Sequence, residues 1–347
     1  MKHAVVLAYP LSLLIGVIHG GMWVFLTGLI SGVGLLLIDR ILPPLAGAQH
    51  ASSKQAAVAE RILALYPAIH TVVFVFTLWA IAQRDFAAWE LAGLIYGLAL
   101  LTGAGAFPAA HELIHRRTPT QRACGVFLLL FPLYMHFRIE HVHGHHRNVA
   151  TPLDPASARL GESVYAFFLR SLSLGFINAW RIERARLQRR GLRGWSWRNR
   201  MLQYTLIQGA ALSGVAYALG QRALLVWLAA ALLSVFLLET INYLEHYGLQ
   251  RRWDAQLKRY EAVGPAHSWN APQAATNAAL FNLGLHASHH RDVGLSFSQL
   301  ASRAAGPQLP FGYFEMAAIA LVPPLWRRLV DPRVPPINAG PQVGAHR

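Results

Sequence analysis

The chain has 347 residues, of which 54% are hydrophobic and only 14% are charged, and its formal net charge is +15. Its single cysteine, Cys124, excludes an internal disulfide framework and a thiolate-held zinc or iron–sulfur site. No glycine-rich dinucleotide motif and no nucleic-acid recognition motif accompanies the positive charge, so the composition favours a membrane protein over a nucleic-acid-binding protein.

Apolar blocks along the chain predict six membrane-spanning helices. The first block, residues 4–38, is longer than one span needs and is interrupted at "HGGM" (19–22), so we expect a hairpin of two helices there. Four further blocks, each almost free of charge, have the length of one span: 66–82, 88–108, 201–219 and 223–243. The predicted fold class is an all-α integral membrane protein.

The distribution of lysine and arginine predicts which side of the membrane each connecting segment faces. With six spans, four segments share one side and carry 29 of the 31 basic residues: 1–3, 39–65, 109–200 and 244–347. The two short loops on the other side hold only Arg84 and Arg222. The positive-inside bias therefore places the basic segments on the cytoplasmic side of a bacterial-type inner membrane. We expect one membrane domain over 1–334 and a flexible tail over 335–347.

Four histidine clusters lie on this predicted cytoplasmic side. They are "HELIH", "EHVHGHH", "NYLEHYGL" and "HASHH", and together they supply nine imidazoles: His111, His115, His141, His145, His146, His246, His286, His289 and His290. Residues four apart on an α-helix lie about 40° apart and one turn along. We therefore expect the two imidazoles of each pair to reach one metal ion: His111 with His115, and His141 with His145.

The number of imidazoles indicates two metal ions. Nine ligands are too many for one ion and enough for two, at four or five each. Imidazole suits zinc, copper, iron and nickel, and two imidazole-bound irons with open positions could bind and activate O₂. Polar residues near the clusters are expected to lie behind the imidazoles and fix their orientation: Glu112, Glu140, Glu245 and Asn242. The alternative is that each glutamate is a solvated helix residue.

Other histidines are not expected to bind metal. Isolated ones are expected to be structural or solvent-exposed: His3, His19, His50, His70 and His346. The sequence leaves His136 undecided.

The second predicted helix carries small residues on one face. In "GLISGVGLLLIDR" (28–40), Gly28, Ser31 and Gly32 fall together by their three- and four-residue spacing. One interpretation is close helix packing, because Gly28 and Gly32 form a GxxxG pair. The other is that this face lines a channel above the metal ions.

The histidine motifs resemble those of the membrane-bound alkane 1-monooxygenases. The resemblance rests on "HELIHRR", "EHVHGHH" followed by "ATPLDPASAR", "NYLEHYGL" and "LHASHH", with further matches at "WSWRN" (195–199), "HSWN" (267–270), "PQLPFGY" (307–313) and "PPLWRRLVDPRV" (323–334). It runs from about Asp39 to Val334. It implies a six-helix membrane fold, two non-haem irons held by the nine histidines, and O₂-dependent hydroxylation of a terminal carbon. It also implies rubredoxin and rubredoxin reductase as the source of electrons.

The same histidine plan resembles two related families, which keeps other reactions open. Xylene-type monooxygenases hydroxylate a methyl group of an alkylbenzene, and fatty-acid desaturases act on lipid acyl chains; a membrane metal-binding protein without turnover is a third alternative. The second and third motifs favour hydroxylation. The chain departs from the alkane hydroxylase pattern at Gly284, Leu285 and Gln273, and it has an additional histidine, His143. These departures concern the substrate and the surroundings of the site.

Arginines crowd residues 181–200, "RIERARLQRRGLRGWSWRNR". Since the chain shows no redox motif of its own, we expect a separate acidic electron carrier to dock on the cytoplasmic face, with this segment as the candidate surface. The alternative is that these arginines hold the anionic headgroups of membrane lipids. The hydrophobic substrate is expected to come from the bilayer.

Overall fold

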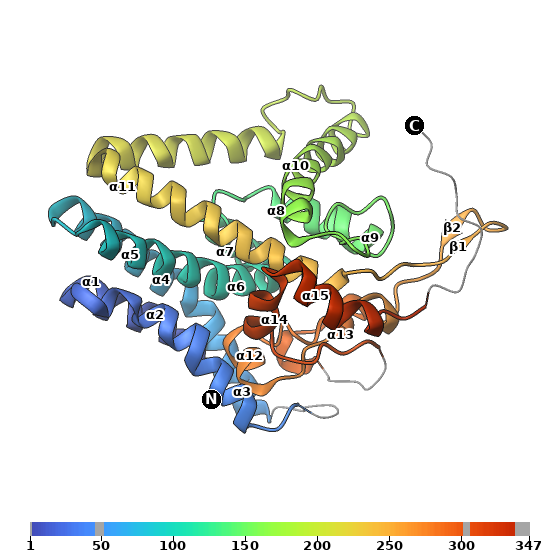
Figure 1. Cartoon of the computed structure of the whole chain (residues 1–347). Coiled ribbons are helices and arrows are strands. Elements are labelled where there is room, and N and C mark those ends of the chain that lie inside the picture. The colour runs from blue at the N-terminus through green and yellow to red at the C-terminus, as the bar shows by residue number, and fades with distance from the viewer. Residues whose placement is uncertain (1, 46–51, 301–305, 337–347) are drawn as a thin grey trace.

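The computed structural model describes residues 2–45, 52–300 and 306–336. Long helices run side by side, and the shorter helices gather at one end of them (Figure 1). Two short strands, β1 (Trp253–Asp254) and β2 (Arg259–Tyr260), pair antiparallel in a hairpin, a small departure from the all-α expectation.

Within these ranges, five continuous helices are long and apolar enough to cross a membrane: Lys2–His19, Gly21–Ile41, Ser53–Gln83, Ala88–Ile114 and Arg200–His246. The first two form the predicted N-terminal hairpin, and they are separated at Gly20, whose φ of +63° is accessible to glycine at little cost. The third helix, α4 (Ser53–Gln83), contains the predicted block 66–82, and the fourth contains 88–108.

Helix α11 (Arg200–His246) contains the last two predicted spans in one run. At Gly220, inside this run, the backbone is not helical, with φ of +81° and ψ of +175°. Figure 1 shows α11 as two helical arms that meet at a sharp bend. The chain thus reverses direction at a glycine, between the predicted blocks 201–219 and 223–243. Each arm corresponds to one of those blocks.

The other long helices are built from several segments. The second apolar helix ends with η3 (Ile30–Gly34) and α3 (Leu35–Ile41), and the fourth consists of α5 (Ala88–Leu100), η4 (Leu101–Ala106) and α6 (Phe107–Ile114). Further elements outside these apolar helices are α7 (Pro119–Leu128), α8 (Phe137–Glu140), η5 (His141–His145), α9 (His146–Asn148), α10 (Val164–Gln188), α12 (Ala274–Ala279), α13 (His286–Arg291), α14 (Tyr313–Ala320) and α15 (Pro323–Val330).

Three of these segments, η3, η4 and η5, are π-helical. A π turn contains one more residue than an α turn, and such turns are frequent at functional sites. The residues that follow each π turn are therefore rotated about the helix axis relative to a regular α-helix. This affects the second apolar helix, the fourth apolar helix and the second histidine motif.

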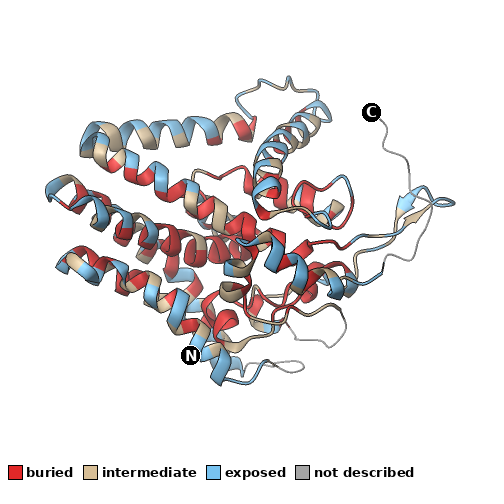
Figure 2. Cartoon of the chain, in the orientation of Figure 1, coloured by how far each residue is buried: buried red, intermediate tan, exposed pale blue. Residues whose placement is uncertain are grey.

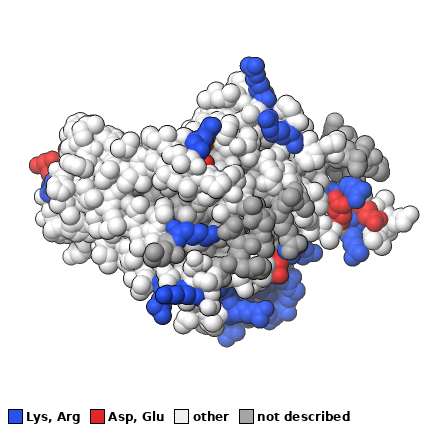
Figure 3. Space-filling view, turned by 90° about the horizontal axis from the view of Figure 1, so that it is seen from below, with Lys and Arg blue, Asp and Glu red and all other residues white. Residues whose placement is uncertain are grey.

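The surface of the long helices is apolar, whereas the basic residues gather at the histidine-bearing end. Figure 2 shows exposed positions along the outer sides of the helices, and these include Leu11, Val72 and Leu232. Large apolar side chains on an outer surface fit contact with lipid. On the face seen in Figure 3, the visible lysines and arginines lie mainly over the half of the molecule that carries the shorter helices. The chain is therefore a multi-pass membrane protein with a polar region at one end of its helices.

Candidate metal centre

The nine clustered histidines come together in two adjacent groups. Five lie in the first group, His111, His115, His141, His146 and His289, and four lie in the second, His145, His246, His286 and His290. Within each group the ligand atoms all lie within 4.8 Å of one another. Helix α6 and the second motif supply four members of the five-histidine group, whereas the four-histidine group joins the end of α11 to helix α13.

The nitrogens in both groups have the spacing of ligands around one ion. Nε2 of His146 lies 3.0 Å from that of His141 and 3.2 Å from those of His115 and His289. An ion that binds imidazoles at 2.0–2.1 Å holds neighbouring nitrogens about 3 Å apart. The residues present therefore fit a metal ion in this group.

The four-histidine group has the same spacing. Nε2 of His286 lies 2.9 Å from that of His290 and 3.2 Å from that of His246, and Nε2 of His145 lies 3.2 Å from that of His290. Burial and the neighbouring imidazoles hold the pKa of His290 well below its usual value, as they do for His146 in the other group. These two rings are therefore neutral near pH 7 and can offer a lone pair to a metal.

The second histidine motif divides its ligands differently from the sequence prediction. His141 and His145 were expected to face the same point, but they belong to different groups, and His141 shares its group with His146. The reason is η5, which is π-helical rather than α-helical, so residues five apart meet on one face. His111 on α6 and His115, the residue that caps the C-terminus of α6, share one group as predicted.

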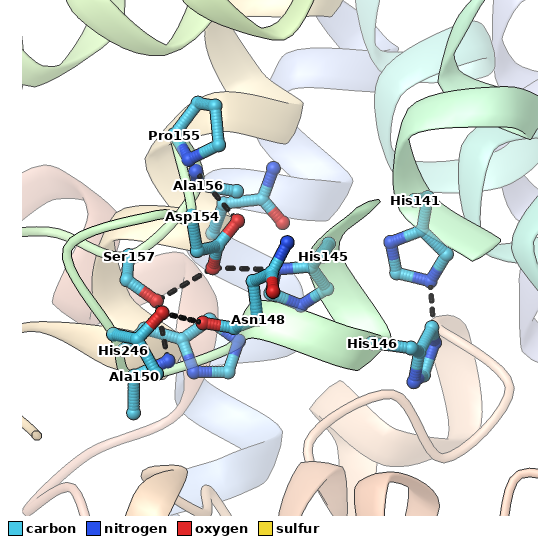
Figure 4. A network of polar contacts seen from close by, with 12 residues as sticks. His141, His145, His146, Asn148, Ala150, Asp154, Pro155, Ala156, Ser157 and His246 are labelled. Carbon is cyan, nitrogen blue, oxygen red and sulfur yellow. Dashed lines mark hydrogen bonds and ion pairs between the residues drawn. The ribbon is translucent and has the colours of Figure 1, made fainter. Parts of the chain in front are cut away.

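A buried aspartate that the sequence analysis did not single out orients His145. Nδ1 of His145 donates to Oδ2 of Asp154 at 2.9 Å, and the same oxygen accepts from Ser157 Oγ at 2.6 Å (Figure 4). Ser157 Oγ in turn accepts from the backbone N–H of Ala150 at 2.8 Å. Burial lowers the pKa of His145, but the carboxylates of Asp154, Glu140 and Glu239 together outweigh burial and raise the pKa. This contact fixes the tautomer that leaves Nε2 free for a metal.

Two further oxygens lie behind members of the four-histidine group. The backbone carbonyl of His267 lies 3.3 Å from Nδ1 of His246. Oε1 of Glu245 lies 3.2 Å from Nδ1 of His286 and accepts from the Tyr313 hydroxyl at 3.0 Å. Glu245 thus has the kind of position expected for it.

The other three polar residues expected behind the imidazoles have different partners. Glu112 pairs with Arg116 at 2.7 Å and accepts from the backbone N–H of Phe297. Glu140 accepts from the Asn178 side chain at 3.2 Å. Asn242 donates to Glu239 at 3.3 Å. All three are buried, so none is a solvated helix residue.

Histidines outside the two groups lie among ordinary protein contacts. His3 is buried between Phe281 and Phe297, and His70 lies 3.2 Å from the Thr102 hydroxyl. His136, which the sequence left undecided, is buried against Tyr134 and Phe176. His19 and His143 are exposed, whereas His50 and His346 lie outside the described residues.

An apolar cavity of about 250 Å³ ends at the histidines. His111, His141 and His286 form part of its lining, and Ser31 and Gly32 of η3 line it as well. Gly32 has open space where a Cβ would lie, but a Cβ on Gly28 would come within 2.6 Å of the Tyr96 ring. Ser31 and Gly32 therefore border the cavity, and Gly28 packs against a neighbouring helix.

The cavity reaches the outer surface of the helices. Gly32, Tyr96 and Leu321 belong to its lining and are also exposed. They come from three separate elements, so the opening lies between η3, α5 and the segment after α14. A hydrophobic molecule in the bilayer can enter a cavity that opens on this side.

Apolar helices that bring histidine clusters together at one end define a class of membrane-bound metal-site proteins, and residues 86–319 match the family model described as fatty acid desaturase. The chain is 41% identical over 248 residues to alkane 1-monooxygenase 1 of Pseudomonas aeruginosa, covering 72% of this chain and 65% of that protein. It is 38% identical over 263 residues to alkane 1-monooxygenase 2 of the same organism, covering 76% of this chain and 70% of that protein. It belongs to the fatty acid desaturase family and, within it, to the alkane 1-monooxygenases.

A second kind of relative matches over a longer region. The chain is 31% identical over 323 residues to the xylene/toluene monooxygenase hydroxylase component XylM of Pseudomonas putida, covering 91% of this chain and 84% of that protein. The first alkane 1-monooxygenase is matched over less than two thirds of its own length.

Proposed function

We propose that this chain is a di-iron monooxygenase that hydroxylates a terminal or alkyl-group carbon of a hydrophobic, alkane-like substrate. The observation that carries this proposal is the apolar cavity whose lining includes histidines of both groups. The alkane 1-monooxygenase relatives support the same reaction. All nine clustered histidines are the proposed iron ligands.

The residues of the chain have separate tasks in this reaction. The cavity binds the alkyl chain, excludes water and directs one carbon toward His111, His141 and His286. Asp154 and the His267 carbonyl hold two imidazoles of the four-histidine group in orientation, and the Glu245 carboxylate lies close to a third, that of His286. Two irons bound there would supply the capacity to bind and reduce O₂.

The electrons for the reaction are proposed to come from rubredoxin, which its reductase reduces. The described residues include no metal-ligand cluster besides the two histidine groups, and Cys124 is the single cysteine of the sequence. A carrier would approach the histidine-bearing end, where basic residues gather. We place that end on the cytoplasmic side of an inner membrane that the chain crosses six times, with the reversal at Gly220 separating the last two crossings. Residues 1–334 would form one membrane domain.

Product analysis tests the proposed reaction. The purified protein, loaded with iron and supplied with rubredoxin, rubredoxin reductase and ¹⁸O₂, is given a panel of n-alkanes. We expect a primary alcohol that contains one ¹⁸O atom per molecule and two irons per chain by metal analysis. An alkene without ¹⁸O would indicate a desaturase instead. An iron-loaded protein that consumes no O₂ with reduced carrier would support metal binding without turnover.

A methyl group of an alkylbenzene is a second candidate substrate. The observation that favours it is the match to the xylene/toluene monooxygenase component, which covers most of both chains. The same ¹⁸O₂ assay with xylene isomers discriminates between the two substrates. A higher kcat/KM for a xylene than for any n-alkane would favour methyl hydroxylation of an aromatic compound.

A further inference from the structure

Helix α10 runs across the direction of the long helices at their histidine-bearing end (Figure 1). The segment that follows it, 189–199, leads directly into Arg200, the first residue of α11. Because α11 is one of the helices suited to cross a membrane, this segment lies where a span enters the bilayer. Its position is therefore set by chain connectivity as well as by its own side chains.

Helix α10 has an apolar stripe on its exposed side. Tyr165, Leu169 and Phe176 are exposed, and their spacing of four and seven residues places them on one face. The opposite face is buried through Val164, Phe167 and Ser171 and related positions further along. The stripe begins beside the bilayer helix, since the Tyr165 ring stacks on Phe236 of α11. A helix that is apolar on an exposed face and lies across the spans has the character of a membrane-surface helix.

Two tryptophans extend this stripe into the segment 189–199. Trp195 is 77% exposed and Trp197 is 73% exposed, although tryptophan is rarely so accessible in water. Trp195 packs against Trp180 of α10, with ring centroids 5.6 Å apart, so the segment is tied to the helix. Tryptophan is enriched at the level of lipid headgroups, where its ring is half in the apolar region.

The charges around these tryptophans are almost all positive. Residues 181–200 contain eight arginines and one acid, Glu183. Glu183 is buried and paired with Arg186 and Arg200, so its charge is already compensated within the protein. Arg189, Arg190 and Arg193 are exposed beside the tryptophans. Within residues 181–200, all of which the structure describes, the ion pairs are the two that Glu183 forms.

We propose that the apolar stripe of α10 together with segment 189–199 forms a membrane-surface site that binds anionic phospholipid headgroups. Trp195 and Trp197 insert at headgroup depth, and Arg189, Arg190 and Arg193 pair with the phosphates. The proposal rests on the membrane setting proposed above and assigns this surface to lipid rather than to the electron carrier. Exposed apolar rings at a basic surface favour lipid, since a soluble carrier that docks transiently is recognised mainly through charges.

Tryptophan quenching by brominated lipids tests this site in the intact protein. Wild type and the W195F/W197F variant are placed in nanodiscs that contain brominated phosphatidylglycerol or brominated phosphatidylcholine. The chain has ten tryptophans, so the difference between the two proteins isolates the emission of Trp195 and Trp197. We expect this emission to be quenched at a severalfold lower mole fraction of the anionic lipid than of the neutral lipid.

Charge variants separate the headgroup site from general membrane contact. R189Q/R190Q should at least halve the preference for the anionic lipid, because each arginine near an anionic surface contributes roughly fivefold in binding and only Arg193 of the three remains. The matched control K258Q/R259Q removes two exposed positive charges from the β1–β2 turn and strand, and it should keep the preference. Circular dichroism confirms that each variant is folded.

Three outcomes would overturn the proposal. Quenching by soluble acrylamide and by neither lipid would place the surface in water. Equal quenching by both lipids in wild type would remove the anionic specificity. A change in this emission when rubredoxin is added to neutral nanodiscs, absent in R189Q/R190Q, would assign the surface to the carrier. The measurement needs no turnover, so its failure is distinct from a failure of the proposed hydroxylation.

Discussion

The two histidine groups differ in what holds their imidazoles. In the four-histidine group, His145, His246 and His286 each have an oxygen near the nitrogen that faces away from the group. In the five-histidine group, the described part of the chain supplies no such oxygen to any member. Oxygens of this kind fix the ring and raise its basicity as a ligand. The four-histidine group is therefore oriented by the protein, and the five-histidine group depends more on the number of its ligands.

The groups also differ in their relation to the cavity. Two members of the five-histidine group, His111 and His141, line the cavity, whereas only His286 of the four-histidine group does. A site that must admit a substrate and O₂ needs ligands that leave room on one side. We infer that the less anchored group contributes more of the surface that the substrate meets, and the anchored group gives the pair of ions a fixed position. The following predictions test this contrast, from the largest expected effect to the smallest.

Removing a ligand from the five-histidine group should have the largest effect. H115A and H289A should each abolish hydroxylation, because the remaining imidazoles cannot complete the site. H143A is the matched control: this histidine lies in the same motif as three ligands, but it is exposed and belongs to neither group. It should keep most of the activity. Product formation and iron content per chain are measured for all three. Equal losses in the three variants would show that the second motif has been assigned wrongly.

Removing the anchor of His145 should have the next largest effect. D154N keeps the size of the side chain but removes the charge that holds Nδ1–H of His145. Loss of such a partner typically lowers metal affinity 10- to 100-fold. We expect D154N to retain one iron per chain at a chelator concentration where wild type retains two. D254N, on the β1–β2 hairpin, is the control and should match wild type. If D154N loses both irons together, the two groups are not independent.

The sequence identified all nine clustered histidines, and it assigned them to the correct group where regular α-helical spacing holds. Where the spacing is not α-helical, the assignment was wrong. Periodicity and charge located the apolar helices, and the i,i+4 spacing of His111 and His115 gave their shared group. The π turn η5 could not be anticipated, because no residue type marks it, and so His141 and His145 were paired wrongly. Asp154 lies in a loop nine residues after its histidine, where spacing gives no geometry. Its place in "ATPLDPASAR", directly after the second motif, was the signal that could have drawn attention to it.

A bulky residue at η3 should alter the substrate without altering either histidine group. G32W would place an indole in open space that borders the cavity, so chain length should be restricted by steric blockage. We expect turnover of long n-alkanes to fall about tenfold relative to short ones, since forcing a long chain past the indole would overpack the cavity at a cost of about 1–3 kcal/mol. S31W should act in the same direction. Product profiles over a series of chain lengths provide the measurement.

The control for G32W is G209W, which adds the same side chain at an exposed glycine of α11 that has open space around it. It should leave the length profile unchanged. Iron content must stay at two per chain in G32W if the cavity wall and the metal site are separate. Loss of folding and iron together would instead favour helix packing at this face. An unchanged profile in a folded, iron-loaded variant would place Gly32 outside the substrate path.

The smallest effect is expected one step behind the anchored group. The Tyr313 hydroxyl donates to Glu245 Oε1, the oxygen that lies 3.2 Å from Nδ1 of His286. Y313F removes this hydrogen bond but leaves the carboxylate in place, and a hydrogen bond to a buried group is worth about 1 kcal/mol. We therefore expect iron retention by the four-histidine group to weaken about fivefold in a chelator titration, less than in D154N. Y165F, whose hydroxyl donates to the Leu321 carbonyl on the surface, should match wild type. If Y313F lowers iron retention as much as D154N does, anchoring is shared along the whole network, and the contrast between the two groups lies in that network rather than in single contacts.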